Sequence, residues 1–394
     1  MSTTTTTLEQ PDTMADPKEL KVGEIRKAIP DHCFRASALR STTHIIVDLI
    51  LASSLAVVGY LYINQIENSP LRWLTWAAYG YVQGLFFVGI WILAHEGGHG
   101  ALYASNSANN AAGFVLHSVL LVPYFSWKYT HARHHRYHNH MEKDTAFVPH
   151  REGENTMSKK IAEMLGHTED APLYHLGLLV LHQLFGWQAY MLSYASGGVA
   201  STPGKLSSFT LQNSHFNPDA GIWTKSQRLA IFSSTLGVSA MFIGLCILGS
   251  QIGAANMVLL YGVPYLWVNN WLVAITYLHH THPDNQHFEA DRWNYTDGAL
   301  ETVDRPFGFI GKHIFHGIID CHVVHHLFPS IPFYHAEEAT AAIRPMLGNR
   351  YKQDDTPFWL ALWQAFTTCH TVKPAEGKPG VLEWAMKSGR VKAQ

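Results

Sequence analysis

The residues most able to do chemistry are histidines in three clusters, which read His95-Glu-Gly-Gly-His99, His131-Ala-Arg-His134-His135 and His322-Val-Val-His325-His326. Residues three or four positions apart lie on one face of a helix, so each cluster would present its imidazoles together. Neutral imidazole binds iron, zinc, copper and nickel. Eight imidazoles exceed the roughly four ligands that satisfy one zinc ion. The pattern therefore predicts two metal ions, and iron engaged in oxygen chemistry is favoured.

A ninth ligand is expected at His280, which follows an apolar stretch within Tyr277-Leu-His-His-Thr-His-Pro283. Histidines that bind metals usually donate their other ring N–H to an acceptor. Acidic residues near the clusters are the candidate acceptors, and they are Glu96, Asp144, Asp297, Asp304 and Asp320.

The remaining histidines near the clusters carry weaker expectations. A hydrophilic stretch after the second cluster is expected at the solvated surface, and it contains His138, His140 and His150. Three others flank the third cluster and could lie behind its ligands, namely His313, His316 and His335.

Two other classes of protein deserve comparison. The first cluster matches HExxH, in which Glu96 would be the general base of an intramembrane zinc protease. Two glycines weaken that helix by about 1 kcal/mol each, and a protease would leave both HxxHH clusters unused. A metal or proton carrier would need polar groups along the spans, whereas the histidines cluster outside them. Both alternatives are disfavoured.

The elements that must position these histidines are apolar. The chain has 394 residues, of which 47% are hydrophobic and only 15% charged, against about 25% charged in soluble domains. Stretches 43–63, 71–94, 229–251 and 257–278 are long enough to cross a bilayer. Stretch 111–127 is too short for a full crossing and is expected to form a re-entrant or interfacial helix with a bend at Pro123. Stretch 173–194 is expected to lie along the interface. We expect an all-α, polytopic membrane protein with about four transmembrane helices, interfacial helices and a His-rich di-iron cap.

The order of spans and clusters predicts the topology. Two spans precede the first two clusters, and two more separate the second cluster from the third. An even number of crossings returns the chain to its starting side, so all clusters and both termini share one face. We divide the chain into an N-terminal leader (1–41), a membrane domain (42–348) and a C-terminal segment (349–394). Four cysteines lie far apart and are expected to be free thiols, as in the cytosol. A net charge of −2 argues against nucleic acid as a partner.

In this order the clusters and their neighbours resemble the membrane fatty acid desaturases of the omega-6 (delta-12) and omega-3 type found in fungi and plants. The segments that carry the resemblance are Gly23–Phe34, His95–His99, Ser126–His135, Thr276–Pro283, Thr296–Arg305 and Asp320–Thr340. The similarity covers about residues 25–347.

The resemblance implies a di-iron enzyme of the endoplasmic reticulum membrane, with its active site and both termini in the cytosol. Dioxygen would be the co-substrate. Reduced cytochrome b5, served by an NADH-dependent reductase, would supply electrons, since the chain has no GxGxxG fingerprint and no fused haem domain. The substrate would be an 18-carbon acyl chain on a phospholipid. The residues that match iron ligands are His95, His99, His131, His134, His135, His280, His322, His325 and His326.

The resemblance favours conversion of oleoyl to linoleoyl chains, which is delta-12 desaturation. Two alternatives use the same scaffold: an omega-3 desaturase acting on linoleoyl chains, and a fatty acid 12-hydroxylase. Pro329 and Ile331, just after the third cluster, differ from the residues usual in plants, so regiochemistry is less determined than reaction type. The sequence makes no prediction of the oligomeric state.

Overall fold

The computed structural model describes residues 20–154 and 172–386. Residues 1–19 of the expected leader and 387–394 of the C-terminal segment lie outside this range. The described chain is mostly helical, and four helical segments are long and apolar enough to cross a membrane: Ala38–Gln65, Ser69–His99, Lys225–Ile252 and Ala254–His280. Each contains one of the predicted spans, so this part of the prediction is confirmed.

The second span is the longest helix, and its ends show why it reaches the first histidine cluster. Helix α3 (Ser69–His99) begins where the Asn68 side chain accepts a hydrogen bond from the Leu71 N–H. It continues through the first cluster and ends at Gly100, whose φ of +76° suits a residue without a Cβ atom. His95 and His99 therefore lie on the last turns of a rigid helix.

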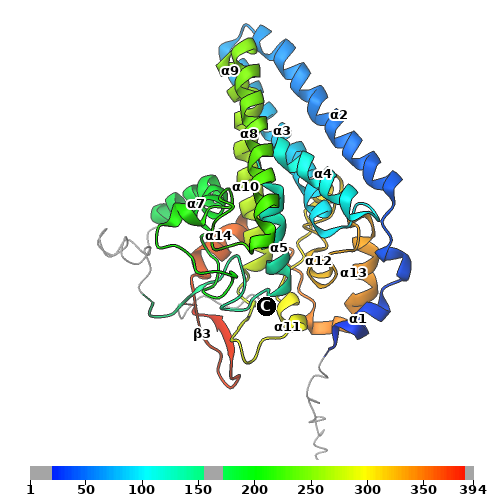
Figure 1. Ribbon diagram of the computed structural model, residues 1–394, viewed down its shortest axis with the longest axis vertical. Helices are drawn as coiled ribbons and strands as arrows, with labels where there is room; N and C mark the ends of the chain where they lie inside the picture. Colours follow the sequence, from blue (N-terminus) through cyan, green and yellow to red (C-terminus); the bar gives the residue numbers. More distant parts are fainter. Residues whose placement is uncertain (1–19, 155–171, 387–394) are drawn as a thin grey trace, which may run out of the picture.

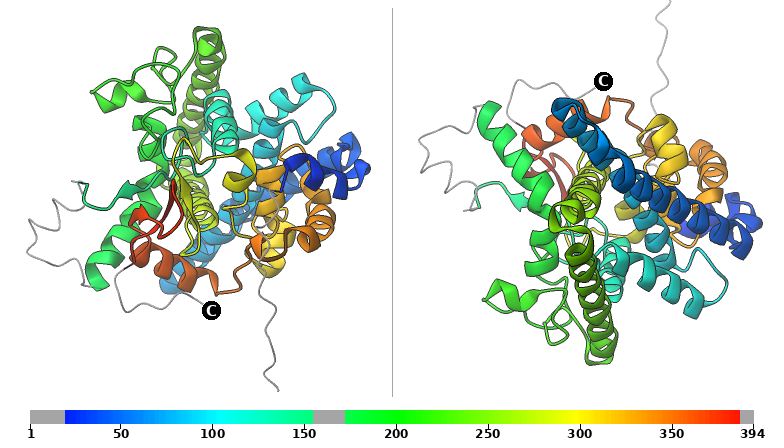
Figure 2. Two further views of the ribbon diagram at one scale, coloured as in Figure 1. Left: turned by 90° about the horizontal axis from the view of Figure 1, so that it is seen from below. Right: turned by 90° about the horizontal axis from the view of Figure 1, so that it is seen from above.

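Helices α3 and α10 (Val263–His280) form the centre of the span region, and α2 (Ala38–Tyr62) and α8 (Arg228–Ile252) flank it. In the most apolar 18-residue segment of each span, 72% of the residues are buried in the second span and 50% in the fourth. The corresponding shares are only 17% in the first span and 11% in the third. Helices α2 and α8 run outward in different directions (Figure 2). Their apolar side chains are thus left facing outward, as expected of helices in lipid.

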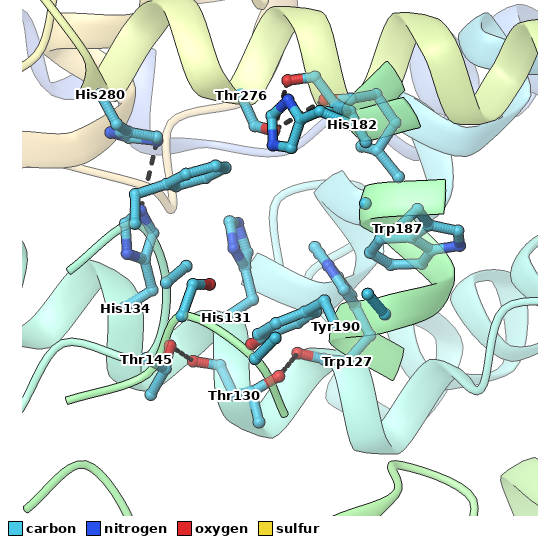
Figure 3. Close-up of a pocket in the computed structure, with 18 of the residues that line it drawn as sticks. Trp127, Thr130, His131, His134, Thr145, His182, Trp187, Tyr190, Thr276 and His280 are labelled. Atoms are coloured by element: carbon cyan, nitrogen blue, oxygen red, sulfur yellow. Dashed lines mark hydrogen bonds between the residues drawn. The ribbon is translucent and has the colours of Figure 1, made fainter. Parts of the chain in front are cut away.

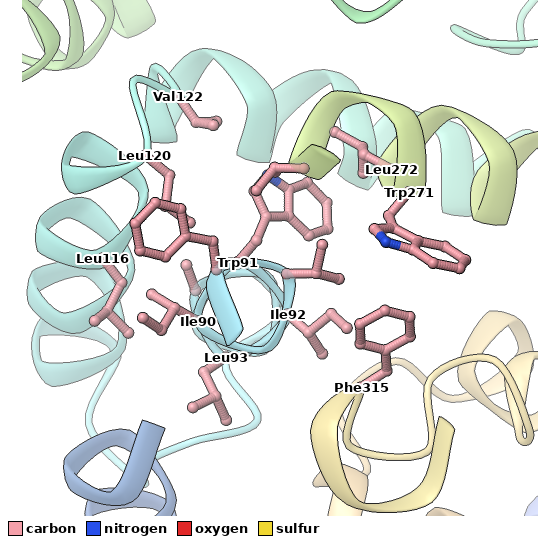
Figure 4. Close-up of a cluster of buried hydrophobic side chains, with 14 of the residues drawn as sticks. Ile90, Trp91, Ile92, Leu93, Leu116, Leu120, Val122, Trp271, Leu272 and Phe315 are labelled. Carbon is pink, nitrogen blue, oxygen red and sulfur yellow. The ribbon is translucent and has the colours of Figure 1, made fainter. Parts of the chain in front are cut away.

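The central core packs around one segment of α3. Figure 4 shows Trp91 and its neighbours on α3 between Leu116 of α4 and Trp271 of α10. Trp271 is 1% exposed, and its ring contacts the ring of Phe315 from the cap, with the centroids 5.6 Å apart. This core fixes the end of α3 relative to α4, α10 and the cap.

The two shorter apolar stretches form helices beside the spans. The stretch 111–127 is broken at the expected position, where Pro123 separates α4 (Asn106–Val119) from α5 (Tyr124–Arg136). The stretch 173–194 forms α7 (Pro172–Ser193). Helix α5 carries the whole second histidine cluster.

A cap of short elements completes the molecule. Its helices are α1 (Val22–Ala28), α11 (Tyr295–Ala299), α12 (His322–Leu327), α13 (Phe333–Leu347) and α14 (Phe358–Thr368). The cap also contains the short helical turns η1 (Asp31–Phe34), η7 (Ile310–Ile314) and η8 (Gly348–Arg350).

Other short turns adjoin the longer helices. Turn η2 (Ile63–Gln65) ends the first span, η5 (Lys225–Gln227) begins the third, and α9 (Ala254–Met257) and the π-turn η6 (Val258–Gly262) lead into α10. Turn η4 (Thr210–Asn213) lies between α7 and α8 in the chain.

A small sheet in the cap is absent from the sequence-based prediction. Its strands are β1 (His150–Arg151), β2 (His287–Phe288), β3 (Thr371–Pro374) and β4 (Val381–Trp384), in the order β1-β3-β4-β2. The β1–β3 pair is parallel, with His150 opposite Thr371. The other two pairs are antiparallel, with Val372 opposite Trp384 and His287 opposite Leu382. Strands of two to four residues are too short for an alternating pattern to be visible.

Helices α1, α5, α11 and α12 and strand β3 lie at one end of the molecule, and α9 lies at the opposite end (Figure 1). The cap therefore lies toward one end of the span region. All four cysteines are free thiols, as expected.

Candidate metal centre

The structure brings all nine predicted histidine ligands together at the junction of the spans and the cap. They come from four helices, namely α3 (His95, His99), α5 (His131, His134, His135), α10 (His280) and α12 (His322, His325, His326). Seven are buried, and His99 and His131 are half-buried.

Five of these histidines form a first group, in which one ring nitrogen from each lies within 4.8 Å of the others: His95, His99, His131, His135 and His325. The Nε2 atoms of His95 and His99 are 3.3 Å apart, and those of His131 and His135 are 3.1 Å apart. The Nε2 atom of His325 has no hydrogen-bond partner among the described residues. The group therefore offers several ring nitrogens to one small volume.

The other four form a second group next to the first. The Nε2 atom of His280 is 3.2 Å from Nε2 of His134 and 3.4 Å from Nε2 of His322. His326 joins this group, and its ring stacks on His135 of the first group with centroids 4.1 Å apart. The two groups thus lie side by side, sharing helices α5 and α12.

An acidic residue orients His134. Its Nδ1 atom is 2.6 Å from Oδ1 of Asp144, which was one of the predicted acceptors. Since a carboxylate accepts, Nδ1 carries the proton and Nε2 is left with a free lone pair. That lone pair points toward His280.

His138 orients His280 in the same manner, a role that the sequence analysis missed. Its Nδ1 atom donates to the Gly298 carbonyl at 2.7 Å, so its Nε2 atom accepts from Nδ1 of His280 at 2.8 Å. Nε2 of His280 is then free of a proton and faces His134 and His322.

The expectation that His138 and His140 lie at the surface is wrong, because each is 1% exposed. Residues far along the chain cover them. The Trp293 indole N–H donates to the His138 carbonyl at 2.9 Å, and His140 forms a β-bridge with Phe288. A local hydrophilic pattern does not report such coverage. His150 is exposed, as expected.

The unprotonated Nε2 atoms of His134 and His280 face each other at 3.2 Å, and they repel unless a cation lies between them. Protonation is an unfavourable remedy here. Burial, reinforced by neighbouring imidazoles, lowers the pKa of the histidines outside the spans well below the usual value, and these are His131, His135, His322, His325 and His326. The donor set therefore fits metal cations that prefer imidazole nitrogen.

The remaining predicted acceptors divide into two kinds. The Asp304 side chain supports the backbone of the third cluster, since its Oδ1 atom accepts a hydrogen bond from the Val323 N–H at 2.7 Å. Asp297 and Asp320 do not serve as acceptors for the cluster: Asp297 binds Arg292 and Arg350, and Asp320 accepts from the Phe307 N–H. That part of the prediction is wrong.

The histidines that flank the third cluster have other surroundings. His316 bonds to Asp48 of α2, with Nε2 2.8 Å from Oδ2. His313 is exposed, and His335 lies near Glu338. None of these contacts involves one of the nine histidines.

Glu96 is buried beside the first histidine group. It is 1% exposed, lies 3.3 Å from Nδ1 of His95, and accepts a hydrogen bond from the Phe333 N–H at 3.1 Å. The two histidines of the HExxH motif, His95 and His99, lie with three further imidazoles, whereas a zinc protease needs only one further ligand. This geometry disfavours the zinc protease.

An apolar cavity of about 250 Å³ opens beside the histidines. Three of them, His131, His134 and His280, lie on one side of it in Figure 3, and Trp127, Trp187 and Tyr190 line the other side. Thr130, Thr145 and Thr276 are among the few polar lining residues, and the Thr145 hydroxyl donates to the Thr130 carbonyl at 2.9 Å. The cavity suits an apolar ligand.

The sequence matches known proteins over this whole region. The family model described as fatty acid desaturase matches residues 71–357, which include all nine histidines. A delta(12) fatty acid desaturase of Mortierella alpina is 41% identical over 364 residues, covering 90% of this chain and 88% of that protein. A delta(12)-fatty-acid desaturase of Arabidopsis thaliana is 40% identical over 364 residues, covering 92% and 90%. An oleate hydroxylase of Claviceps purpurea is 39% identical over 379 residues, covering 92% and 80%.

Proposed function

The chain belongs to the fatty acid desaturase family, and on this premise we propose that it converts oleoyl to linoleoyl groups of membrane phospholipids by delta-12 desaturation. The observation that carries the proposal is the apolar cavity with His131, His134 and His280 in its wall. Relatives named as delta(12) desaturases support the position of the double bond.

We infer that the two histidine groups each hold one iron ion. The first group would comprise His95, His99, His131, His135 and His325, and the second would comprise His134, His280, His322 and His326. When bound, the iron pair would activate dioxygen for hydrogen removal from an unactivated C–H bond. Reduced cytochrome b5 and its NADH-dependent reductase would supply the electrons.

The protein's own residues would position the acyl chain and exclude water. The cavity wall offers large rings, which confine a flexible chain and lower the entropic cost of reaching a reactive geometry. Asp144 and His138 would hold the second group in the tautomer that metal binding needs. Water would be excluded by the same apolar wall.

The proposed setting is the endoplasmic reticulum membrane, with the cap in the cytosol. Its support is the position of the cap at one end of the spans and the presence of free thiols only. The leader (1–41) and the segment 349–394, which precede and follow the membrane domain (42–348) in the chain, would then both be cytosolic, as would both termini.

A second candidate, 12-hydroxylation of oleoyl chains, is favoured by one observation. The oleate hydroxylase relative is as similar to this chain as the desaturases are. Both reactions begin with hydrogen removal from a methylene near the iron pair, so the same site would serve either.

Expression in yeast tests the proposal. Gas chromatography of total fatty esters should show a new linoleate peak for the wild type and none for His134→Ala. The control is His150→Ala, an exposed histidine outside both groups, which should keep the peak. Hydroxy-oleate in its place would establish the hydroxylase, and a triene formed only from added linoleate would establish an omega-3 desaturase. A wild-type chain that binds iron and gives none of these products would contradict the proposal.

A further inference from the structure

A second convergence of metal-binding side chains lies in the cap, apart from the nine histidines. The turn η1 of the leader lies against α13, and one donor atom from each of four residues comes within 4.8 Å of the others: His32, Cys33, His335 and Glu338. None of the four belongs to either histidine group of the candidate metal centre.

The distances place the donors around one point. Nε2 of His32 is 2.9 Å from Oε2 of Glu338 and 3.7 Å from Sγ of Cys33. Nδ1 of His335 is 3.9 Å from the same carboxylate oxygen. Two imidazoles, a thiol and a carboxylate therefore converge on one small volume.

The backbone around these donors is firmly held. Cys33 is 0% exposed and packs in one core with Ile25 of α1 and Ile343 of α13. The Ser37 N–H donates to the Tyr334 hydroxyl at 2.6 Å, and the rings of Phe34 and Phe328 meet edge to face. The donors therefore meet because two packed segments meet, and a cation would bind with little reorganisation.

The donor set matches zinc. Zinc prefers four ligands drawn from cysteine sulfur, histidine nitrogen and carboxylate oxygen. A thiolate and a carboxylate would together balance its two positive charges. The half-exposed side chains of His32 and Glu338 leave a route for the ion to enter.

We propose that His32, Cys33, His335 and Glu338 form a structural zinc site that fastens the leader to α13. The site joins residues 306 positions apart in the chain. Because α13 follows α12, which carries His322, His325 and His326, the fastening also braces the third cluster from behind. The evidence for this zinc site does not depend on the proposed desaturation.

Metal content of the purified full-length protein tests the proposal. Wild type, Cys33→Ser and the control Cys369→Ser are loaded with Zn²⁺, dialysed and analysed for zinc and iron. Cys369 is also a buried thiol, but it packs in a different core. Cys33→Ser should bind one zinc per chain fewer than both other proteins, with iron content unchanged. Equal zinc in all three would overturn the proposal, and zinc held by the nine histidines would not affect the difference.

Glu338→Gln provides the test if Cys33→Ser does not fold, because this side chain is 49% exposed. It should lose zinc to a similar extent. Addition of Co²⁺ to the wild type should also produce a thiolate-to-cobalt absorption band that is missing in Cys33→Ser. If Glu338→Gln keeps its zinc, or the band is absent from the wild type, the site does not exist, whatever the activity of the enzyme.

Discussion

At the scale of single residues, the centre depends on where protons are held. Asp144 accepts a hydrogen bond from the Nδ1–H of His134, and His138 accepts one from the Nδ1–H of His280, so both histidines turn unprotonated Nε2 atoms toward each other. Imidazoles without such partners would be free to rotate or to change tautomer. We conclude that residues behind the ligands are as necessary as the ligands for a neutral, convergent donor set.

Replacing Asp144 with Asn should therefore weaken metal binding without removing a ligand. We expect about a 10- to 100-fold loss in iron affinity or product formation, because an amide is a weaker acceptor and permits the wrong tautomer. Iron analysis of purified protein together with fatty ester profiles would measure it. Asp219→Asn, at a side chain that is 72% exposed, is the control and should behave as the wild type. Equal iron affinity and activity in Asp144→Asn would show that the Asp144 bond does not matter.

At the scale of elements, close helix contacts set the geometry. The glycines of the first cluster, which look unsuited to a helix, lie where α3 meets α4 and α5. A Cβ atom on Gly97 would lie 2.9 Å from the Asn109 carbonyl oxygen, and one on Gly98 would lie 2.8 Å from the Trp127 ring. Glycine thus permits α3 to bring His95 and His99 next to the second cluster.

Gly97→Ala should separate α3 from α4, because the atom it meets belongs to the backbone. We expect a loss of about 1–3 kcal/mol in the free energy of unfolding and a fall in iron content, both measurable on the purified protein. In Gly244→Ala the new Cβ atom on α8 meets nothing within 4 Å, so stability should be unchanged or slightly higher. Equal behaviour of the two variants would refute the close-contact explanation.

An ion pair at the small sheet makes a pH-dependent contribution to the stability of the fold. Arg151 of β1 binds both carboxylate oxygens of Glu289, next to β2, at 2.5 and 2.9 Å. The Arg151 hydrogen bonds lower the pKa of Glu289 below its ordinary 4.5. This pair stabilises the fold fully above about pH 4.5, and its contribution disappears as the pH falls through the folded-state value.

Glu289→Gln should therefore unfold more readily than the wild type at pH 7. The loss should be only about 0.2–1 kcal/mol, because both side chains are partly exposed and solvent screens their charges. Thermal unfolding at pH 7 and at successively lower pH would follow the difference, which should shrink on acidification. A difference that grows as the pH falls would contradict the assigned sign.

At the scale of the whole molecule, helices α3, α5, α7 and α10 enclose a cavity that has three of the nine histidines in its wall. Gly186 of α7 and Val273 of α10 line it, and a Cβ atom on Gly186 would lie 3.5 Å from the Val273 side chain. The position of α7 against α10 therefore determines the space open to an acyl chain.

Gly186→Phe should fill this space. We expect at least about a tenfold loss of product, with the iron content retained. A tenfold change corresponds to roughly 1.4 kcal/mol in activation free energy. Gly177→Phe on the same helix enters open space and should leave product formation unchanged. Fatty ester analysis and iron analysis together would measure the outcome. Full activity of Gly186→Phe would place the acyl chain elsewhere.

Much of this architecture could be predicted from the sequence, because some signals are local. Apolar length predicted the four spans, and HxxHH spacing predicted which imidazoles share a helix face. The unpredicted features depend on distant contacts. His138 is buried by residues 287–298, and the strands that frame this region are only two to four residues long. Glycine in the first cluster looked unfavourable because the sequence of α3 does not show how closely α4 and α5 approach it.

The central claim is that nine histidines from four helices bind two iron ions side by side. An experimental structure of the iron-loaded protein, with anomalous scattering recorded at the iron absorption edge, tests it most directly. We expect two peaks, one among His95, His99, His131, His135 and His325, and the other among His134, His280, His322 and His326. A single peak, or none in a protein that makes linoleate, would contradict the claim.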